Sequence, residues 1–65
     1  MENIVRKLRK EKRLSQNELA KRCKVTRQTI NAIENNKSDP ALSLAFQLAF
    51  LLETKVDTLF RFDEK

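Results

Sequence analysis

Apolar residues recur at helical spacing along most of this chain, and the pattern predicts an all-α fold. Val5 and Leu8, for example, lie three residues apart near the start, which places both on one face of a helix. We expect five helices, over residues 3–12, 16–22, 27–35, 41–52 and 56–60. The segment from Arg61 to Glu64 alternates only weakly and would form a short strand or a tail.

The second and third helices carry strong start signals. Ser15 can cap the second helix, with Glu18 returning the hydrogen bond in a capping box, and Thr26 can cap the third. Each cap is flanked by an apolar pair with the spacing of a hydrophobic staple, Leu14 with Leu19 and Val25 with Ile30. Because only residues 23–25 separate the two helices, the sequence predicts a helix-turn-helix unit.

Length and composition narrow the class of protein. Sixty-five residues predict a single domain over 1–65. The core of so short a chain is small, and we expect self-association to add to its stability. Cys23 is the only cysteine, and the chain has no histidine and no glycine, so we expect no disulfide, metal site or cofactor and no enzyme activity. No small-molecule ligand is evident. We also expect a cytoplasmic protein, because no apolar run could span a membrane and the start lacks a secretory signal.

Charge is divided unevenly along the chain. Residues 1–37 hold eleven lysine or arginine residues against four acidic ones, a net charge of +7, whereas residues 38–65 hold three against five, a net charge of −2. A basic half on a small domain favours a polyanionic partner such as double-stranded DNA. The alternative is a charged surface that serves only solubility, which leaves unexplained why the positive charge falls on the predicted helix-turn-helix unit.

The third helix presents a polar face suited to DNA. If Ile30 and Ile33 face the core, helical geometry exposes Gln28, Asn31, Ala32 and Asn35, with Arg27 at the helix start. Arginine can donate two hydrogen bonds to guanine, and an amide can pair with adenine in the major groove. The alternative is a solvated face, but such faces are usually rich in glutamate and lysine rather than amides.

Flanking residues complete the candidate DNA-binding set. Gln16 begins the second helix, where a side chain and free backbone N–H groups can hold a phosphate. Lys37 follows the third helix and would hold a phosphate or simply be solvated. The candidate DNA-binding residues are therefore Gln16, Thr26, Arg27, Gln28, Asn31 and Lys37.

Glu34 and Arg9 call for a structural explanation. Helical phase turns Glu34 toward the side of Ile30 and Ile33, and it places Arg9 beside Val5 on the first helix. A partly buried ion pair between them would satisfy both charges and fix the third helix on the first.

The fourth helix combines a core face with exposed phenylalanines. Ser43 and Gln47 mark its outside, and Phe46 and Phe50 lie beside them. The expected inward residues are Leu42, Leu44, Ala45, Leu48, Ala49, Leu51 and Leu52. An exposed apolar patch usually marks a contact surface, so we expect a homodimer interface formed by Phe46, Phe50, Phe60 and Phe62. The alternative is a monomer in which Phe62 folds back over the patch.

These motifs together resemble the lambda-repressor-like, Cro-type helix-turn-helix family, also called the xenobiotic response element family. The resemblance lies in LSQNELA, VTRQTINAIENNK, the series Pro40, Leu42, Leu48 and Ala49, and the closing VDTLF, in the family's order and spacing. It implies a five-helix bundle, a recognition helix over about 27–35, and DNA contacts at Gln16, Arg27, Gln28 and Asn31. The Arg9–Glu34 pair matches a salt bridge frequent in such domains.

Two departures from the family pattern concern loops. Lys24 and Asn36 stand where the family often has glycine, which puts the geometry of these turns in question more than the function. A positive φ at Lys24 costs about 1 kcal/mol more than at glycine, whereas asparagine tolerates this conformation better.

The resemblance also indicates how the chain would act. The shortest members are stand-alone dimers with a small antiparallel sheet formed by the chain ends, although Met1 to Asn3 looks like a poor strand here. We therefore expect a dimeric repressor that reads a palindromic operator. The alternative is an antitoxin-like module whose main task is to bind a protein, with autoregulatory DNA binding.

Overall fold

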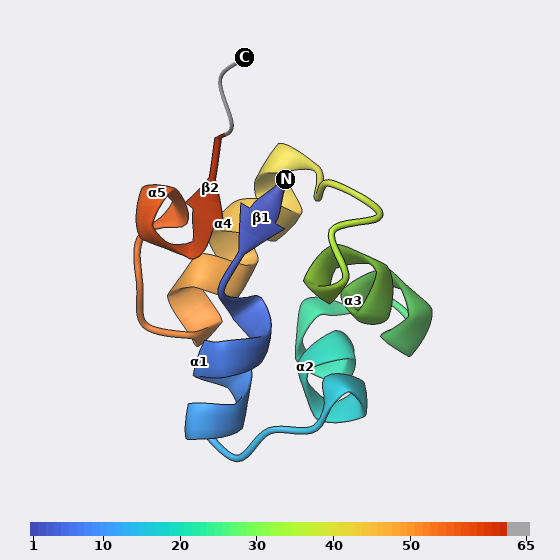
Figure 1. Cartoon of the computed structure of the whole chain (residues 1–65). Helices are drawn as coiled ribbons and strands as arrows, with labels where there is room; N and C mark the ends of the chain where they lie inside the picture. Colours follow the sequence, from blue (N-terminus) through green and yellow to red (C-terminus); the bar gives the residue numbers. More distant parts are fainter. Residues whose placement is uncertain (63–65) are drawn as a thin grey trace.

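The computed structural model describes residues 1–62, which form five helices and a two-stranded sheet (Figure 1). The all-α, five-helix prediction is confirmed, and the helix ends differ from expectation by no more than two residues. In chain order the elements are β1 (Glu2–Asn3), α1 (Val5–Glu11), α2 (Gln16–Cys23), α3 (Arg27–Glu34), α4 (Leu42–Leu51), α5 (Val56–Leu59) and β2 (Phe60–Arg61).

The two-stranded sheet differs from the predictions for both ends of the chain. Glu2 and Asn3, expected to be poor strand residues, pair antiparallel with Arg61 and Phe60. Backbone groups make this pairing, and Ile4 extends it by donating its N–H to the Leu59 carbonyl at 3.0 Å, so side-chain β-propensity matters little over two residues. The strand expected over Arg61 to Glu64 begins at Phe60, and its last two positions lie outside the described residues.

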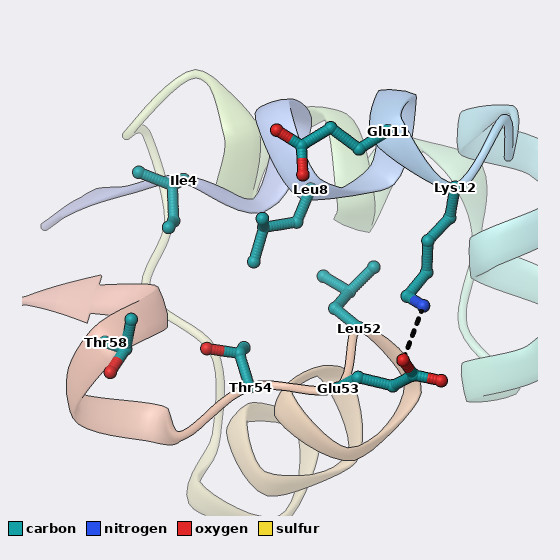
Figure 2. Close-up of a pocket in the computed structure, with 8 residues that line it drawn as sticks. All are labelled: Ile4, Leu8, Glu11, Lys12, Leu52, Glu53, Thr54 and Thr58. Atoms are coloured by element: carbon teal, nitrogen blue, oxygen red, sulfur yellow. Dashed lines mark ion pairs between the residues drawn. The ribbon is translucent and has the colours of Figure 1, made fainter.

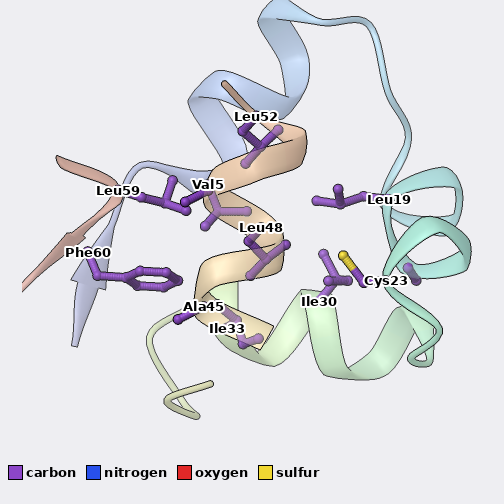
Figure 3. Close-up of a cluster of buried hydrophobic side chains, with 12 residues drawn as sticks. Val5, Leu19, Cys23, Ile30, Ile33, Ala45, Leu48, Leu52, Leu59 and Phe60 are labelled. Carbon is purple, nitrogen blue, oxygen red and sulfur yellow. The ribbon is translucent and has the colours of Figure 1, made fainter. Parts of the chain in front are cut away.

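The core gathers side chains from every helix. Figure 3 shows them converging around α4, with Leu48 near the centre. The largest fully buried side chains are Val5, Leu19, Ile30, Ile33, Leu48 and Leu59. Because α1, α4 and α5 pack against α2 and α3 through this cluster, the core fixes the helix-turn-helix unit on a rigid support.

The predicted capping residues define the starts of α2 and α3. The Ser15 hydroxyl accepts the Glu18 N–H at 3.0 Å, and the Glu18 carboxylate accepts the Ser15 N–H at 2.8 Å. The hydrogen bond that the Ser15 backbone N–H donates to the Glu18 carboxylate, followed by the contribution of the Ser15 side chain, lowers the pKa of Glu18. Thr26 caps α3 by accepting the Thr29 N–H at 3.2 Å. Both helices therefore begin where their caps lie.

Left-handed residues close the turns of this glycine-free chain. Lys24 has φ of 58° and Asn36 has φ of 60°, at the two positions where the sequence predicted such geometry. Arg13 and Glu53 also adopt positive φ. Each non-glycine residue in this region carries a conformational cost, so the turns are held in place by the packing of the helices that they join.

We predict that Lys24→Gly stabilises the protein by up to about 1 kcal/mol, because glycine adopts the left-handed conformation without strain. Thermal or urea unfolding measures the change. Lys21→Gly, the same replacement inside α2, should instead cost about 1 kcal/mol. Equal destabilisation by both variants would contradict a cost at Lys24.

Candidate nucleic-acid interface

The helix-turn-helix unit consists of α2 and α3 joined by a tight turn. Lys24 donates its N–H to the Lys21 carbonyl at 3.2 Å, and Val25 donates to the Ala20 carbonyl at 3.0 Å, so backbone bonds define the turn. Leu19 and Ala20 of α2 and Ile30 of α3 are buried in the core. This packing fixes how α3 is presented to solvent.

The outer face of α3 is polar and exposed. Ile30 and Ile33 are buried, and the predicted reading residues Arg27, Gln28 and Asn31 are exposed on the other side of the helix. Of the other positions expected on this face, Asn35 is exposed and Ala32 is half-buried. The arrangement offers arginine and amide groups to a ligand that approaches α3 from solvent.

The remaining candidates have different surroundings. Thr26 uses its hydroxyl to cap α3, and it also lies 3.1 Å from the Thr29 hydroxyl. Lys37 is exposed, and its N–H is bonded to the Ala32 carbonyl at 2.9 Å. Gln16 is half-buried, and its side chain reaches α3. Of the three, only Lys37 carries a formal charge, and its side chain is exposed.

The predicted ion pair between Arg9 and Glu34 forms between α1 and α3. Arg9 Nε lies 2.7 Å from Glu34 Oε2, and Arg9 Nη2 lies 3.2 Å from Oε1. Both residues are buried, and Arg9 Nη1 also donates to the Leu14 carbonyl at 2.8 Å. The bidentate contact ties the last residue of α3 to α1, and the bond to Leu14 ties Arg9 to the α1–α2 connection.

Glu34 has two further partners that the sequence did not predict. Gln16 Nε2 donates to Glu34 Oε1 at 3.0 Å, and Arg6 Nε donates to the same oxygen at 3.3 Å. Arg6 Nη2 also donates to Asn35 Oδ1 at 2.8 Å. The signal for Arg6 was its position one turn before Arg9, which places both side chains on one face of α1.

These donors decide the charge state of Glu34. Burial alone raises the pKa of its carboxyl group, but hydrogen bonds from Arg9, Gln16 and Arg6 outweigh burial and lower the pKa below the usual range. Glu34 is therefore ionised at neutral pH, so both of its oxygens act only as acceptors.

A second exposed surface lies on α4 and the chain ends. Phe46 and Phe50 are 59% and 81% exposed, and Phe62 is 77% exposed. Phe62 therefore does not cover the patch. Phe60, predicted to join this surface, is only 7% exposed. That prediction is wrong because side chains alternate along β2, which turns Phe60 into the core and Arg61 outward.

Leu42 is also placed differently from expectation. It was expected to face inward, yet it is 72% exposed at the start of α4. Leu42, Phe46 and Phe50 are spaced four residues apart, so they form one stripe along the helix. We call Leu42, Phe46, Phe50 and Phe62 the apolar surface.

A surface hollow lies between α1 and the segment that joins α4 to α5 (Figure 2). An ion pair of 3.1 Å between Lys12 Nζ and Glu53 Oε1 stands at one end. The lining residues are Ile4, Leu8, Glu11, Lys12, Leu52, Glu53, Thr54 and Thr58. They include no predicted DNA contact, so the hollow is separate from the candidate interface.

Within residues 1–62, no group of three or more His, Cys, Asp or Glu side chains could hold a metal ion. No helix in that part of the chain is long and apolar enough to cross a membrane.

Comparison with known proteins identifies the fold. The sequence profile of the helix-turn-helix family matches residues 5–59. This chain belongs to the lambda-repressor-like, Cro-type helix-turn-helix family. An uncharacterized HTH-type transcriptional regulator from Methanocaldococcus jannaschii is 41% identical over 64 residues, which cover 98% of this chain and 97% of the relative. The family consists of DNA-binding transcriptional regulators, which are not an enzyme class.

Solved structures of helix-turn-helix regulators superpose on this chain. The restriction-modification controller protein C.AhdI from Aeromonas hydrophila matches with a TM-score of 0.76 and 30% identity, over 86% of this chain and 81% of that protein. SinR, the master regulator for biofilm formation, was solved in complex with DNA. It matches with a TM-score of 0.75 and 29% identity, over 83% of this chain and 87% of that one.

We predict that Glu34→Ala lowers the free energy of unfolding by about 3 kcal/mol, because it leaves the Arg9 guanidinium buried without its carboxylate. Chemical denaturation measures the loss. Glu2→Ala is a matched control, since it breaks the exposed 3.3 Å contact with Arg61 and should cost less than about 1 kcal/mol. An unchanged melting temperature for Glu34→Ala would show that the ion pair does not stabilise the domain.

Proposed function

We propose that this chain is a dimeric repressor that reads a palindromic operator through α3. The observation that carries the proposal is the exposed polar face of α3, with Arg27, Gln28 and Asn31 free of the core while Ile30 and Ile33 are buried beneath them. This face carries the side chains that discriminate base edges in the major groove.

The distribution of charge also supports DNA binding by the part of the chain that contains α3. The net charge of +7 in residues 1–37 falls on α1, α2 and α3, together with the connections between them. Lysine and arginine side chains there would hold phosphates, and Gln16 and Lys37 would assist at the two ends of the helix-turn-helix unit. Binding should weaken steeply with added salt, because each neutralised phosphate releases counterions.

The proposed dimer uses the apolar surface. Its exposed phenylalanines lie on α4 and after β2, and in Figure 1 β2 is on the left, α2 and α3 are on the right, and α4 runs between them. Pairing through this surface would bury the phenylalanines and leave both α3 helices free. A twofold dimer would then present them to successive major grooves, about 34 Å apart.

We expect selection from a random pool of DNA duplexes to yield symmetric half-sites. Gln28→Ala should relax base preference at one position, with a loss of about 1–3 kcal/mol for the preferred base pair. Lys21→Ala, which removes an exposed charge from α2, should weaken binding to all sequences alike. Fluorescence anisotropy with single-base variants measures both effects.

The opposite pattern for the two variants would contradict these roles. If no duplex is enriched from the pool, the proposal fails, and the antitoxin-like alternative, in which the chain mainly binds a protein, is favoured.

We predict that Phe50→Glu converts a dimer at micromolar concentration into a monomer, because it buries a charge in the apolar surface. Sedimentation equilibrium measures the mass. Asn17→Glu places the same charge at an exposed position of α2, on a different helix from the stripe, and should leave the dimer intact. A monomeric wild-type protein at this concentration would overturn the proposed dimer.

A further inference from the structure

Five side chains around the end of α3 form a closed ring of hydrogen bonds, which we call the amide ring. Arg6 Nη2 donates to Asn35 Oδ1 at 2.8 Å, and Asn35 Nδ2 donates to Asn31 Oδ1 at 3.2 Å. Asn31 Nδ2 donates to Gln16 Oε1 at 3.5 Å, and Gln16 Nε2 donates to Glu34 Oε1 at 3.0 Å. Arg6 Nε closes the ring by donating to the same Glu34 oxygen at 3.3 Å.

The direction of the amide ring is fixed by its two charged members. A guanidinium can only donate and an ionised carboxylate can only accept, whereas each amide can do both. Arg6 therefore faces the oxygen of Asn35, and Glu34 faces the nitrogen of Gln16. Reversing any one amide would bring two donors or two acceptors together, so all three amides run from Arg6 toward Glu34.

The orientation of Asn31 does not depend on the longest bond of the ring. Asn35 Nδ2 donates both to Asn31 Oδ1 at 3.2 Å and to the Asn31 carbonyl at 2.9 Å. Arg6 holds the other end of the Asn35 amide. The oxygen of Asn31 is therefore kept toward Asn35, and its nitrogen is left to face α2, whether or not the 3.5 Å bond to Gln16 is present.

Asn31 keeps the capacity to read a base while it belongs to the ring. An amide has two N–H groups and two oxygen lone pairs, and the ring uses one of each at Asn31. An amide recognises adenine by donating to N7 and accepting from the N6 amino group. Because Asn31 is exposed on α3, the unused N–H and lone pair remain available for this pattern.

We propose that Arg6 and Asn35 are positioning residues that lock the Asn31 amide, so that the regulator distinguishes an A·T base pair from T·A at the position that Asn31 reads. A free amide can rotate by half a turn and accept adenine in either orientation, whereas a locked amide matches only one. The inference rests on the proposed reading of DNA by α3. It adds two residues that the sequence did not mark as specificity determinants.

The test compares binding to duplexes that carry each of the four base pairs at one half-site position, chosen as the position where Asn31→Ala loses selectivity. We expect the wild type to prefer one orientation of the A·T pair over the other by about tenfold. Arg6→Gln replaces an obligate donor with a two-way amide and should reduce this ratio to about twofold or less.

Lys7→Gln is the matched control, because it removes one charge from the neighbouring exposed position of α1 and leaves the ring intact. It should lower the affinity for all duplexes and preserve the ratio. Asn35→Asp is a second variant: its carboxylate still accepts from Arg6 but would attract the N–H of Asn31 instead of its oxygen, so the wild-type preference should be lost or reversed. Melting curves confirm that each variant is folded.

A double-variant experiment separates positioning from direct reading. In the Asn31→Ala background, Arg6→Gln should leave the relative affinities for the four base pairs unchanged. An effect that persists there would mean that Arg6 reads the base itself, and it would overturn the inference. A uniform loss for all four duplexes in the Arg6→Gln single variant would overturn it too, because Arg6 would then only hold a phosphate.

The free protein offers a readout that needs no DNA. Arg6 does not contact Asn31 in the ring, yet Arg6→Gln should shift the side-chain amide NMR signals of Asn31 as well as those of Asn35. Shifts confined to Asn35 would contradict the coupling. If the wild type shows no preference among any duplexes, the proposed function is refuted and this inference with it. If the wild type has a base preference and Arg6→Gln leaves the A·T to T·A ratio unchanged, only the inference is refuted.

Discussion

The domain depends on keeping one buried carboxylate fully paired. Glu34 ends α3 on its core side, where an ionised group without donors would cost several kcal/mol. Its donors come from α1 and α2, through Arg9, Arg6 and Gln16. Because they approach from two different helices, α3 cannot roll or slide without breaking at least one of these bonds.

The same carboxylate links the core to the solvent-facing side of α3. Gln16 contacts Glu34 with its nitrogen and Asn31 with its oxygen, so a buried charge and an exposed amide share one side chain. In a 65-residue protein there is little room for separate scaffold and recognition layers. Under the proposed function, Arg6 and Asn35 would therefore act in both, and their effects on stability and on selectivity need to be measured separately.

The two exposed surfaces have opposite chemistry. The outer face of α3 is polar, and the stripe of Leu42, Phe46 and Phe50 on α4 is apolar. Leu48 lies on the inward side of α4, where it packs in the core with Ile30 and Ile33 of α3. The rigid core thus sets the geometry between the surface proposed for pairing and the surface proposed for reading DNA.

Features that depend on residues close together in the chain could be predicted before the fold was known. The caps at Ser15 and Thr26, the left-handed turn at Lys24 and the inward phase of Glu34 all follow from residues a few positions apart. Features that depend on partners far apart in the chain became visible only in the folded molecule: the pairing of Glu2–Asn3 with β2, the burial of Phe60, and the amide ring. Phe60 and Phe62 are the same residue type two positions apart, and a strand partner almost sixty residues away decides where the strand lies and hence which side chain is buried.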